Sequence, residues 1–151
     1  MLNHLPTTIQ VMELFFDAES VLYYSLLNEC LYKFENLRDL AFNICEFKQL
    51  IPSPILKLPK SIIYLAVYTE DDTPGVLTPL FKGAVELENL KYFKVDFSSL
   101  QDVPSSDTEA LAEMLSKNPT VYKSCKILTP TVSGNLIKAF TTIKTRDLIL
   151  D

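Results

Sequence analysis

Apolar residues recur along the chain in short groups with the spacing Leu-x-x-Leu-x-Leu. In the first group Ile9, Met12 and Leu14 are apolar, and most of the residues between them are polar. This alternation is typical of a short strand with one buried face, so we expect a strand over residues 9–15. Continued along the chain, the spacing predicts six strands whose central inward residues are Met12, Leu40, Leu65, Phe93, Cys125 and Leu148.

These groups belong to longer repeats. Within the stretch 87–97, residues 87–95 match residues 34–42, and residues 58–68 match residues 5–15, both at an offset of 53 residues. Successive central inward residues lie 28, 25, 28, 32 and 23 positions apart. Self-similarity at a nearly fixed period indicates stacked structural units. We therefore expect one repeat domain over residues 1–151, with about six repeats and an insertion before the fifth strand.

The segments between the first strands differ in character. Residues 18–34 carry apolar side chains at three- and four-residue steps, which predicts a helix. Between residues 46 and 58, Pro52 and Pro54 exclude a regular helix, because proline lacks a backbone donor and restricts the residue before it. Residues 78–79 are Thr-Pro and can begin a short helix.

The last third of the chain has two more predicted helices. Ser106 and Glu109 have the spacing of a capping box, which predicts a helix that runs to about Lys117. Residues 133–142 form a second apolar helical pattern. In the fifth strand Val121 fits the apolar spacing only if one extra residue is inserted, so we expect a bulge or a shift of register there.

Composition and charge narrow the function classes. The chain is 48% hydrophobic and carries a net charge of -5, a poor match for nucleic acid or for an anionic membrane surface. No apolar run approaches the ~18 residues of a membrane span, and the N-terminus lacks the pattern of a signal peptide. We expect a cytoplasmic or nuclear protein whose partners include neither nucleic acid nor membrane.

Candidate chemistry is sparse in this chain. His4 is the only histidine, and the three cysteines, Cys30, Cys45 and Cys125, are odd in number and lack metal-ligand spacing. Buried free thiols are the interpretation that we favour. The acidic run at residues 70–72 falls in a predicted turn and is interpreted as solvated. We expect no catalytic residue, no metal and no cofactor, and therefore no enzyme.

One passage resembles a known family. Residues 109–121 read EALAEMLSKNPTV, which is similar to the helix-to-strand passage of ribonuclease-inhibitor-like leucine-rich repeats. The resemblance implies an α/β leucine-rich repeat solenoid with a curved parallel sheet and a mixed helical and irregular convex side. It also implies that Cys45, at the ninth motif position, bonds the turning backbone. A doubly wound α/β domain is the structural alternative, although alternating strands argue against burial on both faces.

A second resemblance concerns the N-terminal part. Residues 5–12 and 17–26 are similar to the F-box, a helical adaptor-binding segment, and in that interpretation residues 9–16 form a helix. F-box proteins often carry leucine-rich repeats as substrate receptors. The alternative function is therefore an F-box-type substrate receptor of a ubiquitin ligase, with residues 5–34 as the adaptor-binding box.

The function that we expect first is a non-enzymatic scaffold that binds another protein on its concave sheet face. In a parallel stack Tyr64 and Tyr92 become lateral neighbours, with Tyr68 nearby, and tyrosine is a favoured interface anchor. Cations gather on the C-terminal half of the same face, which predicts an acidic or extended partner segment. The predicted cationic residues are Lys91, Lys94, Lys123, Lys126 and Arg146.

The two ends of the array suggest a further contact. Few residues precede Ile9, and the chain stops soon after Leu148 and Leu150. A terminal repeat without a polar cap exposes its core side and its strand edge. We therefore expect self-association through uncapped ends, or further repeats in a longer parent protein.

Overall fold

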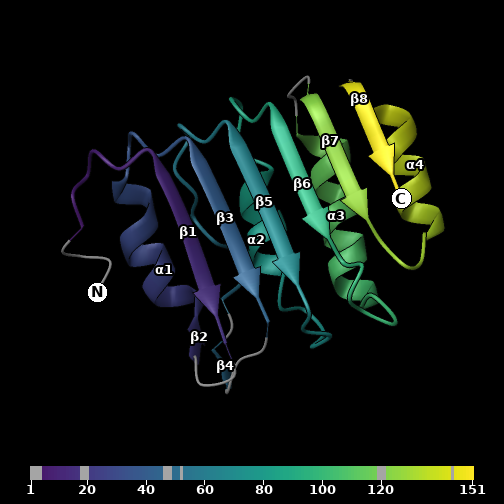
Figure 1. Cartoon of the computed structure of the whole chain (residues 1–151), viewed down its shortest axis with the longest axis horizontal. Helices are drawn as coiled ribbons and strands as arrows, with labels where there is room; N and C mark the ends of the chain where they lie inside the picture. Colours follow the sequence, from purple (N-terminus) through teal and green to yellow (C-terminus); the bar gives the residue numbers. More distant parts are fainter. Residues whose placement is uncertain (1–4, 18–20, 46–48, 52, 119–121, 144) are drawn as a thin grey trace.

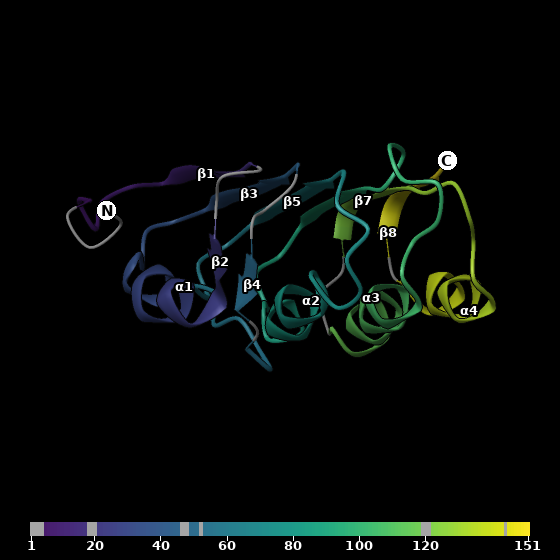
Figure 2. The ribbon, with the colours of Figure 1, turned by 90° about the horizontal axis from the view of Figure 1, so that it is seen from below.

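The computed structural model describes residues 5–17, 21–45, 49–51, 53–118, 122–143 and 145–151. Within these residues the fold is α/β, with one six-stranded parallel sheet and four α-helices. The strand order is β1-β3-β5-β6-β7-β8, so consecutive units along the chain are neighbours in space (Figure 1). Parallel neighbours need a crossover connection, and the helices of these connections all lie on one side of the sheet (Figure 2).

The strands of the main sheet follow the repeated apolar spacing. Their bounds are Val11–Phe16 for β1, Asp39–Ile44 for β3, Tyr64–Thr69 for β5, Tyr92–Asp96 for β6, Tyr122–Leu128 for β7 and Thr145–Leu150 for β8. The register aligns Met12, Leu40, Leu65, Phe93, Cys125 and Leu148 across the sheet. The predicted central column is therefore confirmed.

The helices form a second layer against one face of the sheet (Figure 2). They are α1, Tyr24–Cys30, which continues into the 3₁₀ helix η2, Leu31–Lys33; α2, Thr78–Ala84; α3, Ser105–Lys117; and α4, Gly134–Thr142. The helix predicted from Thr78-Pro79 is α2, with proline in its first turn. The helix predicted over residues 133–142 is α4, where the Ser133 hydroxyl accepts a hydrogen bond from the Leu136 N–H.

The N-terminal units differ from the prediction of one helix over residues 18–34. The chain first forms a short strand, β2, Val21–Tyr23, which pairs in parallel with β4, Gln49–Ile51. Helix α1 then occupies only seven residues, because the chain between β1 and β3 also supplies this second ladder. Residues 18–20 lie outside the described part. In the stretch between residues 46 and 58, where a regular helix was excluded, the chain forms β4; residues 46–48 and 52 lie outside the described part.

One part of the F-box interpretation is wrong. That interpretation requires a helix over residues 9–16, whereas Val11–Phe16 is strand β1. The strand pairs residue by residue with β3, with Met12 opposite Leu40 and Leu14 opposite Phe42. The alternating apolar pattern therefore determined the local structure here.

The expected irregularity in the fifth strand is also corrected. Tyr122, three residues before Cys125, is 1% exposed and takes the inward position that was assigned to Val121. β7 continues the register of its neighbours, with Ser124 opposite Tyr92 and opposite Asp147. No bulge interrupts β7. The Tyr122 ring packs near Phe93, with 6.5 Å between the ring centroids. Val121 itself lies outside the described residues.

The buried column ends before the last strand. Leu65 is 0% exposed, whereas Leu148, at the equivalent position of β8, is 43% exposed. The prediction that Leu148 belongs to the buried column is therefore wrong. β8 is one of the two edge strands and has a neighbour, β7, on one side only, so the packing that covers Leu65 from both sides is not present around Leu148. At the opposite edge Met12 of β1 is 7% exposed.

The capping box predicted at Ser106 and Glu109 is not formed. Helix α3 begins at Ser105, its N-cap is Pro104, and no side chain caps it. The buried Ser106 hydroxyl has no hydrogen-bond partner. Asp107 instead points to the loop before α2, where its carboxylate accepts hydrogen bonds from the Gly75 and Leu77 N–H groups and from the Thr78 hydroxyl.

Asp107 ties α3 to the loop before α2. The residue is 1% exposed, and its three hydrogen-bond donors lie at 3.1, 3.1 and 2.8 Å. Burial raises the pKa of Asp107, while the hydrogen bonds from Thr78, Gly75 and Leu77 act in the opposite direction. Gly75 has a φ of 81°, a conformation that favours glycine. This link between two neighbouring units was not predicted.

Close packing of the second layer depends on Gly83 in α2. A Cβ atom at this position would lie 1.8 Å from the Leu56 carbonyl oxygen, so the backbone of residue 56 fits only against glycine.

In the described part of the chain, none of the helices has the length and apolar character needed to cross a membrane.

Candidate partner-binding face

The sheet has one covered face and one open face. The four helices, with β2 and β4, lie on the covered side, and no described helix or strand lies on the other side, which we call the open face (Figure 2). Residues that alternate with the core positions project there. The register aligns two columns on this face: Val11, Asp39, Tyr64, Tyr92, Ser124 and Asp147, and Glu13, Ala41, Ala66, Lys94, Lys126 and Ile149. The predicted lateral pairing of Tyr64 with Tyr92 is thereby confirmed.

The three tyrosines predicted for partner binding come together. Tyr64 of β5 is the direct partner of Tyr92 of β6. Tyr68 follows Tyr64 by four residues in β5 and therefore lies on the same face of the strand. Burial and a hydrogen bond with the Tyr68 side chain raise the pKa of Tyr64. Tyr92 is 37% exposed, while Tyr64 and Tyr68 are half-buried. The cluster therefore offers large apolar surfaces with accessible polar tips.

A hollow of about 550 Å³ lies beside this cluster, over strands β1, β3, β5 and β6. We call it the hollow. Its lining consists of Val11, Met12, Glu13, Asp39, Leu40, Ala41, Ile63, Tyr64, Ala66, Tyr68 and Tyr92. Sequence reasoning missed it. The available signal was the pair Ala41 and Ala66, because two small residues side by side on a face with large neighbours leave space above the sheet.

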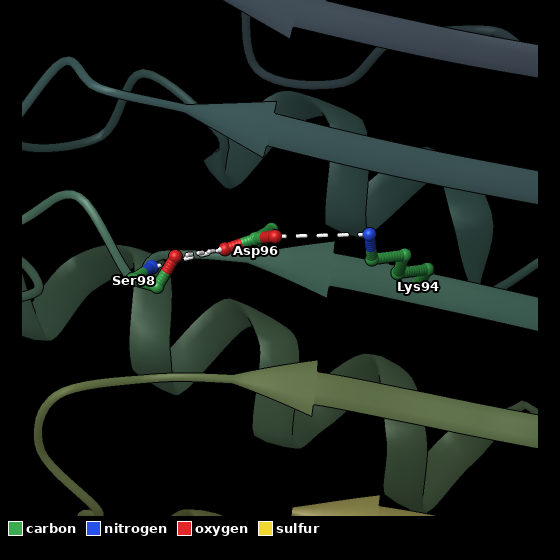
Figure 3. A network of polar contacts seen from close by, with 3 residues as sticks. All are labelled: Lys94, Asp96 and Ser98. Carbon is green, nitrogen blue, oxygen red and sulfur yellow. Dashed lines mark hydrogen bonds and ion pairs between the residues drawn. The ribbon is translucent and has the colours of Figure 1, made fainter. Parts of the chain in front are cut away.

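Lys94 is the cation closest to the tyrosines. Its Nζ lies 4.4 Å from the centroid of the Tyr68 ring and 3.7 Å from the Asp96 carboxylate (Figure 3). Asp96 also accepts hydrogen bonds from the Ser98 hydroxyl at 2.6 Å and from the Ser98 N–H at 3.1 Å. Burial alone would raise the pKa of Asp96, but these hydrogen bonds and the charge of Lys94 outweigh it and lower the pKa. The charge of Lys94 is thus partly compensated.

Of the other predicted cations, Lys91 precedes β6, Lys123 and Lys126 belong to β7, and Arg146 belongs to β8. Lys94, Lys123 and Lys126 form what we call the lysine strip, while Lys91 lines a separate hollow with Glu35 and Arg38. Lys91 and Lys123 are exposed and Lys126 is half-buried. The Lys123 Nζ lies 5.8 Å from the centroid of the Tyr92 ring. The side chain of Arg146 lies outside the described part. The open face therefore combines an aromatic hollow with a cationic strip.

The cysteines differ from one another in burial. Cys30 and Cys125 are buried, as expected, and burial raises the pKa of Cys125 to about 12. Cys45 is free but exposed, so the expectation of burial is wrong for this residue. It follows the end of β3, and its backbone N–H donates to the Phe16 carbonyl. Among the described residues no three His, Cys, Asp or Glu side chains come together to hold a metal ion.

Comparison with known proteins identifies neither a family nor a function for this chain. No protein family, curated protein or solved structure matches this chain. The geometry of the open face is therefore the basis on which its function is argued.

Proposed function

We propose that this chain is a non-enzymatic protein-interaction scaffold that binds an acidic, extended segment of a partner protein on its open face. The observation that carries the proposal is the lysine strip beside the Tyr64, Tyr68 and Tyr92 cluster, on a sheet face that no described element covers. Tyrosines supply anchoring area, and carboxylates of the partner pair with the ammonium groups.

The proposal includes a repeat architecture of the leucine-rich type. Support comes from the parallel strands that follow one another in sequence order and from the central column that runs from Met12 to Leu148. In such an array each unit contacts mainly its neighbours, so a binding face is assembled from equivalent positions of successive units. We place the protein in the cytoplasm or nucleus, because Cys45 and Cys125 are free thiols.

A fluorescently labelled heptaglutamate peptide tests the cationic half of this face. We expect its binding, followed by fluorescence anisotropy at low salt, to weaken by about ten-fold or more in Lys123→Glu with Lys126→Glu, because each substitution replaces attraction by repulsion. The matched control is Lys138→Glu, an exposed lysine of α4 in the helix layer. Equal losses in both variants would show a non-specific effect of net charge and would overturn the proposal.

We also propose self-association through the edge strands. Large apolar side chains are exposed on both: Val11 and Phe15 of β1 at 67% and 69%, and Leu148, Ile149 and Leu150 of β8 at 41–44%. An unpaired edge with apolar side chains is a template for another strand. Analytical ultracentrifugation should give a concentration-dependent mass that Ile149→Lys reduces. A monomer at every concentration would contradict this contact.

A further inference from the structure

We propose that the hollow binds an arginine side chain of the same partner segment whose acidic residues meet the lysine strip. The inference rests on the proposed function and adds the chemistry and spacing of the segment: a cation over β1, β3 and β5, and carboxylates some positions away from it, over β6 and β7.

The floor of the hollow suits the aliphatic part of a long side chain. Ala41 and Ala66 are neighbours in the register and carry only methyl groups, and Val11 is exposed at the rim. Ala66 is 0% exposed and Ala41 is half-buried, so Ala41 is the part of this floor that an incoming side chain can reach. A long side chain with an apolar stem and a charged tip can cover such a floor while its tip reaches polar groups.

The charged groups of the hollow have the sign that an arginine tip requires. Glu13 and Asp39 both line it, and no lysine or arginine does. The Asn43 amide donates a hydrogen bond of 2.6 Å to the Glu13 carboxylate, which holds that side chain in place on the face. A guanidinium group can donate to both carboxylates at once, because its five N–H groups form a rigid fork.

The aromatic wall favours the same occupant. Two cations of the chain already lie over tyrosine rings of this cluster, Lys94 over Tyr68 and Lys123 over Tyr92, so these rings attract positive charge. The ring of Tyr64 also lines the hollow and has no cation of the chain over it among the described contacts. Guanidinium groups stack on aromatic faces better than ammonium groups. The pairing of Lys94 with Asp96 reduces its repulsion of an incoming arginine.

The spacing of the strands gives the spacing of the partner residues. The hollow is centred near β3 and β5, and Lys126 is on β7, three strands beyond β3. Three inter-strand steps of about 4.8 Å make about 14 Å, and an extended chain advances about 3.4 Å per residue. The nearest acidic residue should therefore lie about four positions from the arginine in the partner sequence, and the direction tested below places the arginine first.

The first experiment tests the pocket alone. N-acetyl-arginine methylamide is titrated into the ¹³C-methyl-labelled protein, with N-acetyl-citrulline methylamide as the neutral probe of the same shape. We expect arginine to shift the Ala41 and Ala66 methyl signals and to bind about ten-fold more tightly than citrulline, because only arginine makes charge-assisted hydrogen bonds. Glu13→Gln with Asp39→Asn should remove that difference, whereas Glu109→Gln, an exposed residue of α3, should not. Equal shifts by both probes, or none, would overturn the arginine pocket.

The second experiment tests the order of the segment. The spaced peptide Arg-Thr-Val-Thr-Asp-Glu-Asp is compared with Thr-Val-Thr-Arg-Asp-Glu-Asp, which has the same composition but places arginine beside the acidic residues. We expect the spaced peptide to bind about ten-fold more tightly. If heptaglutamate binds but the two peptides do not differ, the inference fails and the proposed function stands. If heptaglutamate does not bind, the proposed function fails as well.

Discussion

Strand β5 shows how differently the two faces of one sheet are built. Leu65 and Val67 point to the helix layer and are 0% exposed, while Tyr64 and Tyr68 alternate with them on the open face and remain half-buried. The covered face is a continuous apolar core, and Phe81 of α2 packs edge-on against Phe93 there. The open face mixes aromatic, small and charged residues. Neighbouring residues of the same strand therefore lie in two different environments, and only those of the open face are proposed to bind a partner.

This difference means that substitutions on the two faces should have separate consequences. A residue of the covered face touches partners in two layers, so its loss leaves a cavity that the structure cannot fill. A residue of the open face mostly contacts solvent or its lateral neighbours, so its loss changes binding more than folding. The following predictions test that separation, beginning with the largest expected effect.

Leu65→Ala should lower the free energy of unfolding by about 2–5 kcal/mol, because a fully buried leucine leaves a cavity. Chemical denaturation measures the loss. Leu148→Ala is the matched control at the same position of β8, and because Leu148 is 43% exposed its loss should stay below about 1 kcal/mol. Similar losses for the two variants would show that Leu148 is as well buried in the protein as Leu65.

Asp107→Ala should cost about 2–3 kcal/mol, because it leaves the N–H groups of Gly75 and Leu77 and the Thr78 hydroxyl without their acceptor. Asp107→Asn keeps one acceptor oxygen and should cost less. Urea unfolding of both variants tests the order. If the alanine and asparagine variants both kept the wild-type free energy of unfolding, the link between α3 and the loop before α2 would not contribute to stability.

Tyr64→Ala should weaken binding of the spaced peptide by about 2 kcal/mol, the effect of removing an interface anchor. Isothermal titration calorimetry measures it, and the free energy of unfolding should change less than in Leu65→Ala. The control is Tyr32→Ala, which removes a tyrosine that is 52% exposed on η2, in the helix layer. Unchanged affinity in Tyr64→Ala would remove this tyrosine from the binding face.

Lys91→Glu with Lys94→Glu should slow association of heptaglutamate about ten-fold and flatten its dependence on salt, because exposed charges act mainly on the association rate. Stopped-flow fluorescence at several ionic strengths provides the measurement. A change confined to the dissociation rate would indicate that these lysines make close contacts and do not steer the ligand.

The smallest effect concerns pH and Asp96. Its pKa in the folded protein lies below the ordinary value near 4, so its ionised form contributes stability above that value, and the contribution is lost as the pH falls through the lowered pKa. The difference in free energy of unfolding between the wild type and Asp96→Asn should therefore shrink as the pH falls below about 4. A difference that grows on acidification would contradict the Lys94, Asp96 and Ser98 network.

The amino-acid sequence alone determined the parallel register of the main sheet. A strand repeats every two residues, so the spacing of Met12, Leu40 and Leu65 predicted both the buried column and the columns on the opposite face. Tyr64 and Tyr92 were placed side by side for this reason. The short helix at Thr78-Pro79 and the helix over residues 133–142 followed equally from local rules. The irregularity expected at Val121 was an error of one position, since Tyr122 was not counted among the inward residues.

Only the tertiary structure decided the features that depend on contacts between units. The pairing of β2 with β4 shortened α1. Where a capping box at Ser106 was expected, Asp107 instead accepts a hydrogen bond from the Gly75 N–H. The hollow arises because Ala41 and Ala66 meet across two strands beside larger side chains, and the exposure of Leu148 reflects its place at the sheet edge. Local patterns determine which face a residue occupies, whereas burial, hydrogen-bond partners and cavities depend on residues that are distant in sequence.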